Sequence, residues 1–367
     1  MGLFTLLSSS SPAYEPLPTN NGPTTRSSRF TLNKRLLGAV AALGIVVYTA
    51  TIWWLSKKLT KKPYSYLDNY EYINTIPIVR DESQWSSPSR AVFSSLYSDS
   101  FALAAAVLGY SIRRANVSAS MILPYIENQV SPKALCIART SGWETHPVQL
   151  ISPPHNGEGI AARFKDQYTK LAIWSLGEEL GFDNAVYMDA DTLVLRNFDE
   201  LFNFPWEFGA GLDVFQPSDV RGFSVNYNAG VLVFRPSRST FEDMKSKWET
   251  ANFPLGFAEQ SFLNLYFGGK GVRLPYAYNA NMVIKERSTE LWAELMDDMR
   301  ILHYTTVKPF WHTKMPDDAL LTPEEIRQVI ETSEARQGGL YREEVGLWRD
   351  AFEQMMQDNG EAIMACY

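Results

Sequence analysis

The sequence predicts an α/β domain, in which a mixed but mostly parallel sheet is covered by helices, preceded by one transmembrane helix. Two observations support this prediction. Patterns typical of strands and of helices alternate from Ala91 onward, and such alternation indicates parallel strands joined by helical crossovers. Upstream of them, residues 36–55 form an apolar run without a charged residue, which is long enough to cross a bilayer.

The composition indicates a folded protein and excludes several classes of function. Hydrophobic residues make up 45% of the chain, with 10 Trp and 20 Phe, which is enough for a sizeable core. The net charge of −7 opposes a surface built to neutralise phosphates, so nucleic acid is not an expected partner. Cys136 and Cys366 are the only cysteines. They exclude a Cys-rich zinc site, and whether they pair stays open.

The apolar run at 36–55 is predicted to be a transmembrane helix. At 1.5 Å per residue it spans about 30 Å, the thickness of one hydrocarbon core. Trp53 and Trp54 lie where interfacial aromatics are found. A signal peptide would have a shorter apolar region nearer the start, and a buried core helix would rarely be apolar all round.

The orientation of this helix is not decided by charge, because basic residues lie on both sides. Residues 1–35 are rich in Ser, Pro, Thr and Asn and are expected to form a disordered cytosolic tail. Residues 56–90 lack a sustained period and are expected to form a stem. Everything foldable follows the span, so we expect the folded domain in the lumen. The sequon at Asn116 is compatible with this orientation.

The folded domain is expected to cover residues 91–314. In its first half, the hydrophobic pattern of a strand alternates regularly with that of a helix. Expected strands lie at 91–96, 121–126, 147–151 and 184–188, and expected helices lie at 100–114, 131–140 and 164–181.

The second half of this domain changes to an α+β pattern on the same sheet. Expected strands lie at 208–215, 228–236, 272–275 and 300–304, and expected helices lie at 241–249 and 258–267. Residues 315–367 are expected to form a C-terminal helical extension, with a helix that begins at Thr322-Pro323-Glu324-Glu325.

The end of the expected strand at 184–188 is the most informative part of the sequence, because Asp189-Ala190-Asp191 follows it directly. Side chains alternate along an extended chain, so both carboxylates can project to one side. Ligands gather beyond the carboxyl ends of strands in open α/β sheets. Two adjacent carboxylates favour a divalent cation such as Mg²⁺ or Mn²⁺. An ordinary turn with two solvated aspartates is the alternative.

The segment VYMDADTLVLRNFDELF resembles the metal-binding segment of glycosyltransferase family 8, the family of glycogenin, galactinol synthase and plant xylan glucuronosyltransferases. TKLAIWSL, NAGVLVFRPS, AEQSFLN, LPYAYN and LHYTTVKPFWH occur in that family's order and at similar spacing. The resemblance covers about residues 91–312. It implies a GT-A (Rossmann-like nucleotide-diphospho-sugar transferase) fold, a donor that is usually a UDP-sugar, a Mn²⁺ requirement and retention of the anomeric configuration.

The resemblance implies a metal site of Asp189, Asp191 and His303, with Ala190 beside the donor. An imidazole ligand favours Mn²⁺, with Mg²⁺ as the alternative. Lys308 would stabilise the charge that develops on the departing diphosphate. Without the resemblance, His303 would be interpreted as the end of a core strand and Lys308 as a surface lysine.

Further positions are implied to bind the donor or to take part in catalysis. Lys170 and Gly230 match donor-contacting positions, and Ser95 and Tyr97 match the nucleobase site after the first strand. The residues expected beside the transferred sugar, as the catalytic set, are Asp213, Asn228, Glu259 and Gln260. A solvated helix residue at Lys170 and a backbone cap at Asn228 are the alternatives.

Three departures from glycogenin are visible. Ser98 and Phe101 replace its Asn and Tyr, so uridine specificity follows from the family more than from these residues. The interval from His303 to Lys308 is shorter and lacks a glycine, as in the plant enzymes. After LPYAYN no tyrosine stands where glycogenin glucosylates itself, which disfavours self-priming.

The expected function is Mn²⁺-dependent transfer of a sugar from a UDP-sugar to a glycan or glycolipid acceptor. The expected location is the Golgi membrane, with a type II topology and a lumenal catalytic domain. Transfer of N-acetylglucosamine, as in a fungal-type enzyme, is the expected specialisation among donors that include glucose, galactose and glucuronic acid. The alternatives are an inactive, membrane-tethered sugar-binding protein and a glycogenin-like priming transferase.

Overall fold

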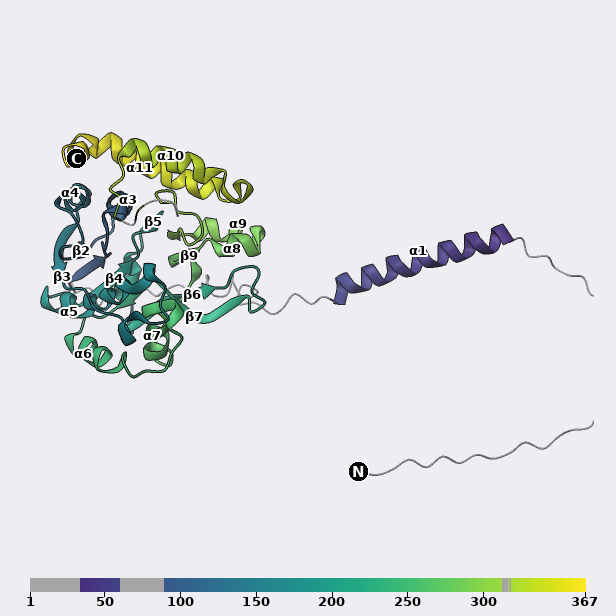
Figure 1. The fold of residues 1–367 in the computed structure, drawn as a ribbon, viewed down its shortest axis with the longest axis horizontal. Coiled ribbons are helices and arrows are strands. Elements are labelled where there is room, and N and C mark those ends of the chain that lie inside the picture. The colour runs from purple at the N-terminus through teal and green to yellow at the C-terminus, as the bar shows by residue number, and fades with distance from the viewer. Residues whose placement is uncertain (1–33, 60–88, 312–315, 317) are drawn as a thin grey trace, which may run out of the picture. The chain divides into compact units, whose positions relative to one another are not determined.

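The computed structural model describes residues 34–59, 89–311, 316 and 318–367 (Figure 1). The expected tail at 1–35 and the expected stem at 56–90 lie almost entirely outside these residues. The chain divides into two units, Met1–Lys62 and Pro63–Tyr367, and each is described by itself.

In the first unit, α1 (Lys34–Leu59) is one continuous helix. Its segment Ala39–Ser56 is long and apolar enough to cross a membrane, and its side chains are exposed within the unit. The prediction of one N-terminal apolar helix is confirmed. That this helix crosses a membrane stays a prediction.

A seven-stranded sheet forms the centre of the second unit, in the order β3-β2-β1-β4-β7-β6-β8. β1 is parallel to β2 and β4, β2 is parallel to β3, and β6 is parallel to β8, whereas β7 is antiparallel to β4 and β6. The predicted mixed, mostly parallel sheet is therefore confirmed. The strands are β1 (Arg90–Phe93), β2 (Ser120–Ile126), β3 (Glu144–Val148), β4 (Asn184–Met188), β6 (Phe208–Val214), β7 (Phe223–Phe234) and β8 (Val272–Leu274).

A smaller sheet with the order β5-β10-β9 continues from the end of β4. Its strands are β5 (Thr192–Val194), β9 (Ala280–Asn281) and β10 (Ile301–His303). β10 is antiparallel to β5, and this pairing sets His303 opposite Thr192. Residues far apart in the sequence are thereby brought beside the aspartates that follow β4.

Helices cover both faces of the larger sheet (Figure 1). Successive residues of the central strands enter opposite cores, because side chains alternate along a strand: Val92 and Val186 lie in one core, and Phe93 and Tyr187 lie in the other. The helices are α3 (Ala102–Arg114), α4 (Pro132–Thr140), η5 (Ala162–Leu171), α5 (Ala172–Glu179), α6 (Arg238–Lys247), α7 (Ala258–Phe267), α8 (Val283–Arg287), α9 (Thr289–Asp298), α10 (Pro323–Glu334) and α11 (Arg342–Met364), with short 3-10 turns between them.

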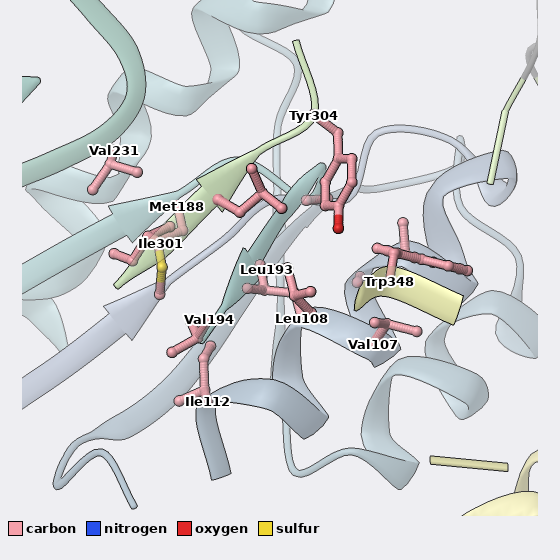
Figure 2. Close-up of a cluster of buried hydrophobic side chains, with 14 of the residues drawn as sticks. Val107, Leu108, Ile112, Met188, Leu193, Val194, Val231, Ile301, Tyr304 and Trp348 are labelled. Carbon is pink, nitrogen blue, oxygen red and sulfur yellow. The ribbon is translucent and has the colours of Figure 1, made fainter. Parts of the chain in front are cut away.

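Figure 2 shows the first of these cores. Leu108 and Ile112 of α3 face Leu193 and Val194 of β5, and Trp348 of α11 lies at its edge. The core is continuous from the sheet to the C-terminal helices, so α11 is packed as part of the same domain.

The structure corrects the long helix predicted over 164–181. Its first half is the 3-10 helix η5, and α5 begins only at Ala172. Tyr168, Thr169, Lys170 and Leu171 are all buried, which an α-helix with one exposed face does not allow. The irregular turn lets the Thr169 Oγ1 accept from the Ile151 N–H at 3.1 Å while Lys170 enters the sheet edge.

Three strands differ from their predicted bounds by three residues or more. β1 ends at Phe93 and not at residue 96. β3 begins at Glu144 and ends at Val148, before most of the predicted 147–151 segment. It lies at the edge of the sheet and none of its residues is buried, so its apolar pattern is weak. β7 begins at Phe223, earlier than predicted. Its first residues pair with β6 through irregular register shifts.

The C-terminal helices pack on the segment that follows β10. α10 begins with the predicted cap, in which Thr322 and Glu325 form a reciprocal capping box. The Tyr304 hydroxyl donates to the Glu344 carbonyl of α11 at 2.8 Å, and the rings of Phe310 and Trp348 lie 5.7 Å apart. The residues between His303 and Phe310 are thus held by the extension.

Cys136 and Cys366 form a disulfide, which settles the pairing that the sequence left open. It joins α4 to the end of the segment that follows α11 and closes a separation of 230 residues. The Lys133 ammonium also donates to the Tyr367 carbonyl, at 2.5 Å. The C-terminal helices are therefore fastened at their far end.

We expect the double substitution of Cys136→Ser with Cys366→Ser to lower the free energy of unfolding by about 2–4 kcal/mol, because a crosslink over a long loop restricts the unfolded chain. Thermal unfolding of the full-length chain in detergent measures this effect. Reduction with dithiothreitol should lower the Tm of the wild type and leave the double variant unchanged. Equal midpoints for all three would contradict a stabilising crosslink.

Candidate active site

Three side chains at the carboxyl edge of the sheet form a candidate metal site. Asp189 follows β4, Asp191 precedes β5, and His303 ends β10, and one ligand atom from each lies within 4.8 Å of the others. The Tyr304 N–H donates to the Asp191 carbonyl at 2.9 Å. The pairing of β5 with β10 therefore fixes the distance between the carboxylates and the imidazole.

Asp191 is buried between two cationic or potentially cationic groups. His303 Nε2 lies 3.2 Å from Asp191 Oδ1, and the Lys308 ammonium pairs with Asp191 Oδ2. Burial alone would raise the pKa of Asp191, but Lys308 and His303 hold this pKa well below its usual range. Asp191 is thus ionised and already oriented, as a candidate metal ligand.

The residues present fit a divalent cation. Two carboxylates with one imidazole are a donor set suited to Mn²⁺. At this edge of the sheet carboxylates outnumber ammonium groups. The carboxylates belong to Asp189, Asp191, Asp213 and Glu259, and the ammonium groups belong to Lys170 and Lys308. Such an excess of buried negative charge is offset when a divalent cation binds.

Gly230 of β7 is required by the position of His303. A Cβ at this residue would lie 2.1 Å from His303 Cε1 and 2.5 Å from Nδ1, closer than real contacts allow. The Gly230 carbonyl accepts from the Asp189 N–H at 2.8 Å. The glycine therefore allows the imidazole to approach the backbone that also orients Asp189.

Lys170 is a buried anchor and not a solvated helix residue. Its Nζ lies 2.9 Å from Asp189 Oδ1 and 2.8 Å from Glu259 Oε1, and it donates to the Ala229 carbonyl at 3.2 Å. Burial lowers the pKa of this ammonium, but the two carboxylates outweigh burial and raise the pKa of Lys170 above its usual value. Lys170 is charged and holds both carboxylates in place.

Asp189 is also oriented by a chain of hydroxyls. The Tyr187 hydroxyl donates to Asp189 Oδ1 at 2.8 Å, so Ser95 Oγ, 2.8 Å from the same hydroxyl, donates to Tyr187. Tyr97 lies nearby, and burial raises the pKa of its phenol, while the charge of Lys170 opposes this rise. The end of β1 therefore lies beside the metal site.

The residues expected beside the transferred sugar form a second cluster around Asp213. Gln260 Nε2 donates to Asp213 Oδ2 at 2.9 Å, and Asn228 Nδ2 donates to Oδ1 at 3.1 Å. Burial raises the pKa of Asp213, and hydrogen bonds from Val214, Asn228 and Gln260 oppose that rise. Gln260 is itself fixed, because its Oε1 accepts from the Ala229 N–H at 3.0 Å.

The structure brings the residues singled out from the sequence to one edge of the sheet. Their contacts, with Tyr187 and Asn279 as links, form one connected set around the candidate metal site. Its members are Ser95, Tyr97, Lys170, Asp189, Asp191, Asp213, Asn228, Gly230, Glu259, Gln260, His303 and Lys308. Ala190 lies between the two aspartates in the sequence.

Sequence reasoning missed Tyr187, Asn279 and Asn281. Asn279 Oδ1 lies 2.9 Å from His303 Nδ1, and Asn281 Nδ2 lies 3.4 Å from Asp213 Oδ1. Both asparagines are buried. A signal was present, since Asn279 ends the LPYAYN segment and Tyr187 lies within VYMDAD, but neither pattern states which side chain faces the site.

A family profile described as Glycosyl transferase family 8 matches residues 92–315. Inositol phosphorylceramide glucuronosyltransferase 1 of Arabidopsis thaliana is 33% identical over 172 residues, which cover 47% of this chain and 29% of the relative. Galactinol synthase 2 of Solanum lycopersicum is 29% identical over 212 residues, which cover 50% of this chain and 60% of the relative. The matched part of this chain thus spans 29% to 60% of these relatives' lengths.

Solved structures with a similar chain course include the galactosyltransferase LgtC in complex with donor and acceptor sugar analogs. It is 18% identical, with a TM-score of 0.44, and the match covers 66% of this chain and 95% of that chain. Mouse xyloside xylosyltransferase 1 is 11% identical, with a TM-score of 0.39 and coverage of 60% and 99%. The profile match covers more than half of the sequence, so the chain belongs to glycosyl transferase family 8 and has its GT-A-like α/β fold.

Proposed function

We propose that this chain transfers a sugar, with retention, from a UDP-sugar to a glycan or glycolipid acceptor and that it uses Mn²⁺. The observation that carries the proposal is the Asp189, Asp191 and His303 cluster at the carboxyl edge of the sheet, with Lys308 on the same carboxylate. Family membership supports the reaction class.

The proposed reaction breaks the bond between the anomeric carbon and the β-phosphate oxygen of the donor. The acceptor hydroxyl oxygen forms the new bond on the same face, and its proton passes to the departing phosphate. Mn²⁺, when bound by the two aspartates and His303, supplies positive charge to the diphosphate. Because no separate nucleophile is then needed, the chain's own residues mainly position the donor and neutralise charge.

Lys308 has two successive partners in this proposal. Without donor, its ammonium neutralises Asp191. With Asp191 as a ligand of the metal, the flexible Lys308 side chain would be free to turn toward the diphosphate, where its ammonium would stabilise the charge on the leaving group. The Lys308 carbonyl accepts from the Ser333 hydroxyl of α10, so its backbone is held while its long side chain can turn.

Glu259 is proposed to act as a positioning residue. Its carboxylate is buried and ion-paired with Lys170 at 2.8 Å, and Lys170 also contacts Asp189. A carboxylate already neutralised in this way is a poor nucleophile. Its function in this arrangement is to fix Lys170, while Asp213, Asn228 and Gln260 present polar groups to sugar hydroxyls.

We also propose a lumenal position for the domain, on a type II Golgi protein anchored by α1. The Cys136–Cys366 disulfide supports an oxidising compartment, since such crosslinks are rare in the cytosol. The sequon residue Asn116 is exposed in the turn after α3, where a glycan fits. Transfer of N-acetylglucosamine is the first donor specificity to test.

A membrane-tethered protein that binds sugars without turnover is the second candidate. The same edge of the sheet would then bind the donor without cleaving it. Priming of the glycogenin kind is less well supported, because the segment after LPYAYN has no tyrosine for self-glucosylation.

We expect the full-length chain in detergent to hydrolyse one UDP-sugar, from a panel that includes UDP-N-acetylglucosamine, with Mn²⁺ and not with EDTA. Asp191→Asn should reduce this rate at least about 100-fold, because it removes an anionic metal ligand. The matched control is Asp297→Asn on the exposed side of α9, which should retain wild-type turnover. Donor binding without hydrolysis under every condition would favour the sugar-binding candidate.

Lys308→Met tests separately the two proposed interactions of the Lys308 ammonium, one with the diphosphate and one with Asp191. Hydrolysis should fall by about 10²–10³-fold, because charge on the leaving group loses a stabilising cation. Mn²⁺ alone should bind the variant more tightly than the wild type, since no ammonium competes for Asp191. Titration followed by electron paramagnetic resonance of free Mn²⁺ measures this, with Lys245→Met on α6 as the control. Weaker Mn²⁺ binding would contradict the competition.

In microsomes, the full-length chain is expected to be protected from added protease and to carry a glycan that peptide-N-glycosidase removes. Asn116→Gln should abolish the glycan and keep the protection. Cys136 and Cys366 should not react with maleimide until a reductant breaks their disulfide and frees the thiols. Digestion of the domain in intact microsomes would place it in the cytosol and reject the lumenal proposal.

A further inference from the structure

The metal-facing histidine is connected to a chain of buried amides whose direction can be deduced. Asn279 Oδ1 lies 2.9 Å from His303 Nδ1. Asn279 Nδ2 donates to Asn228 Oδ1 at 3.0 Å, and Asn228 Nδ2 donates to Asp213 Oδ1 at 3.1 Å. The chain thus runs from the sugar-side carboxylate to the metal-side imidazole.

The orientation of Asn228 is fixed from both ends. Its Oδ1 accepts from the Gly230 N–H at 3.0 Å, and a backbone N–H can only donate. Its Nδ2 faces Asp213, which also accepts from the Val214 N–H at 3.0 Å and from Gln260 at 2.9 Å. Turning the Asn228 amide around would oppose donor to donor at Gly230 and acceptor to acceptor at Asp213.

The orientation of Asn279 follows from that of Asn228. Because Asn228 presents an oxygen, Asn279 must present its NH₂ group there, and its own Oδ1 is left facing His303. An amide oxygen accepts only, so Nδ1 of His303 must carry a proton. Nε2, which faces Asp191 at 3.2 Å, is then the nitrogen that can offer a lone pair to a cation.

Close packing keeps this chain in place. Asn279 is fully buried, and a Cβ at Gly211 would lie 2.7 Å from Asn279 Cβ. A Cβ at Gly230 would likewise meet the His303 ring. The amide side chain and the imidazole therefore lie directly against the backbone of two glycines on neighbouring strands.

We propose that Asn279, oriented by Asn228, the Gly230 N–H and Asp213, is a positioning residue that fixes the His303 tautomer for metal binding. The inference rests on the proposed Mn²⁺ site. It links the sugar side of the site to the metal side, since the groups beside Asp213 also determine which imidazole nitrogen faces the cation. Hydrogen bonds of this kind raise metal affinity by holding a ligand in the binding tautomer.

The test compares two substitutions of asparagine in the full-length chain in detergent. Asn279→Leu removes the group that accepts the hydrogen bond from His303 Nδ1, whereas the control Asn197→Leu removes a half-buried amide that donates to the Ala115 and Asn116 carbonyls after α3. Mn²⁺ affinity is read from electron paramagnetic resonance of free Mn²⁺. We expect Asn279→Leu to bind Mn²⁺ about 10–100-fold more weakly and Asn197→Leu to bind within a few-fold of the wild type.

A spectroscopic measurement on the wild type covers the case in which Asn279→Leu does not fold. With ¹⁵N-labelled histidine and diamagnetic Zn²⁺ in place of Mn²⁺, the His303 signal, identified by its loss in His303→Gln, should show a proton on Nδ1. A proton on Nε2 of the wild type, or equal Mn²⁺ affinity for Asn279→Leu and the wild type, would overturn the inference and leave the metal site standing. No Mn²⁺ binding by the wild type would instead reject the proposed metal site, and this inference with it.

Discussion

The burial of several carboxylates at one edge of the sheet is the constraint on which the rest of this site depends. Charges removed from water are tolerated only when they are paired and hydrogen-bonded. Lys170 offsets Asp189 and Glu259, and Lys308 offsets Asp191, which also lies 3.2 Å from His303 Nε2. The lysines leave an excess of negative charge, which is the electrostatic reason that a divalent cation fits here.

Two irregular features of the fold, the 3-10 helix η5 and the small second sheet, bring basic side chains to these carboxylates. The 3-10 helix η5 turns Lys170 inward beside Thr169, and the small sheet of β5, β10 and β9 carries His303 back to the strand end after β4. The C-terminal helices contact Tyr304 and Phe310 and so support the loop that ends in Lys308. The disulfide then fixes the far end of those helices.

The polar groups around the metal site differ from its ligands in what they contribute. Asp189 and Asp191 supply charge, while Asn228, Asn279 and Gln260 supply direction, because amides with both ends occupied cannot turn around. Gly211 and Gly230 contribute space alone. These groups are therefore already oriented in the structure, so little ordering would be left for the proposed binding of a cation and a donor.

The sequence by itself determined the α/β alternation, the apolar helix and the candidate ligands, because local periodicity and the Asp-x-Asp spacing are written in neighbouring residues. It also indicated the start of α10 through the cap at Thr322. Only the tertiary structure decided that Cys136 pairs with Cys366, that Lys170 is buried in a 3-10 turn, and that Asn279 lies against His303. The physical reason is that these contacts join residues far apart in the chain, and their hydrogen-bond directions follow from burial and strand register, which no local pattern encodes.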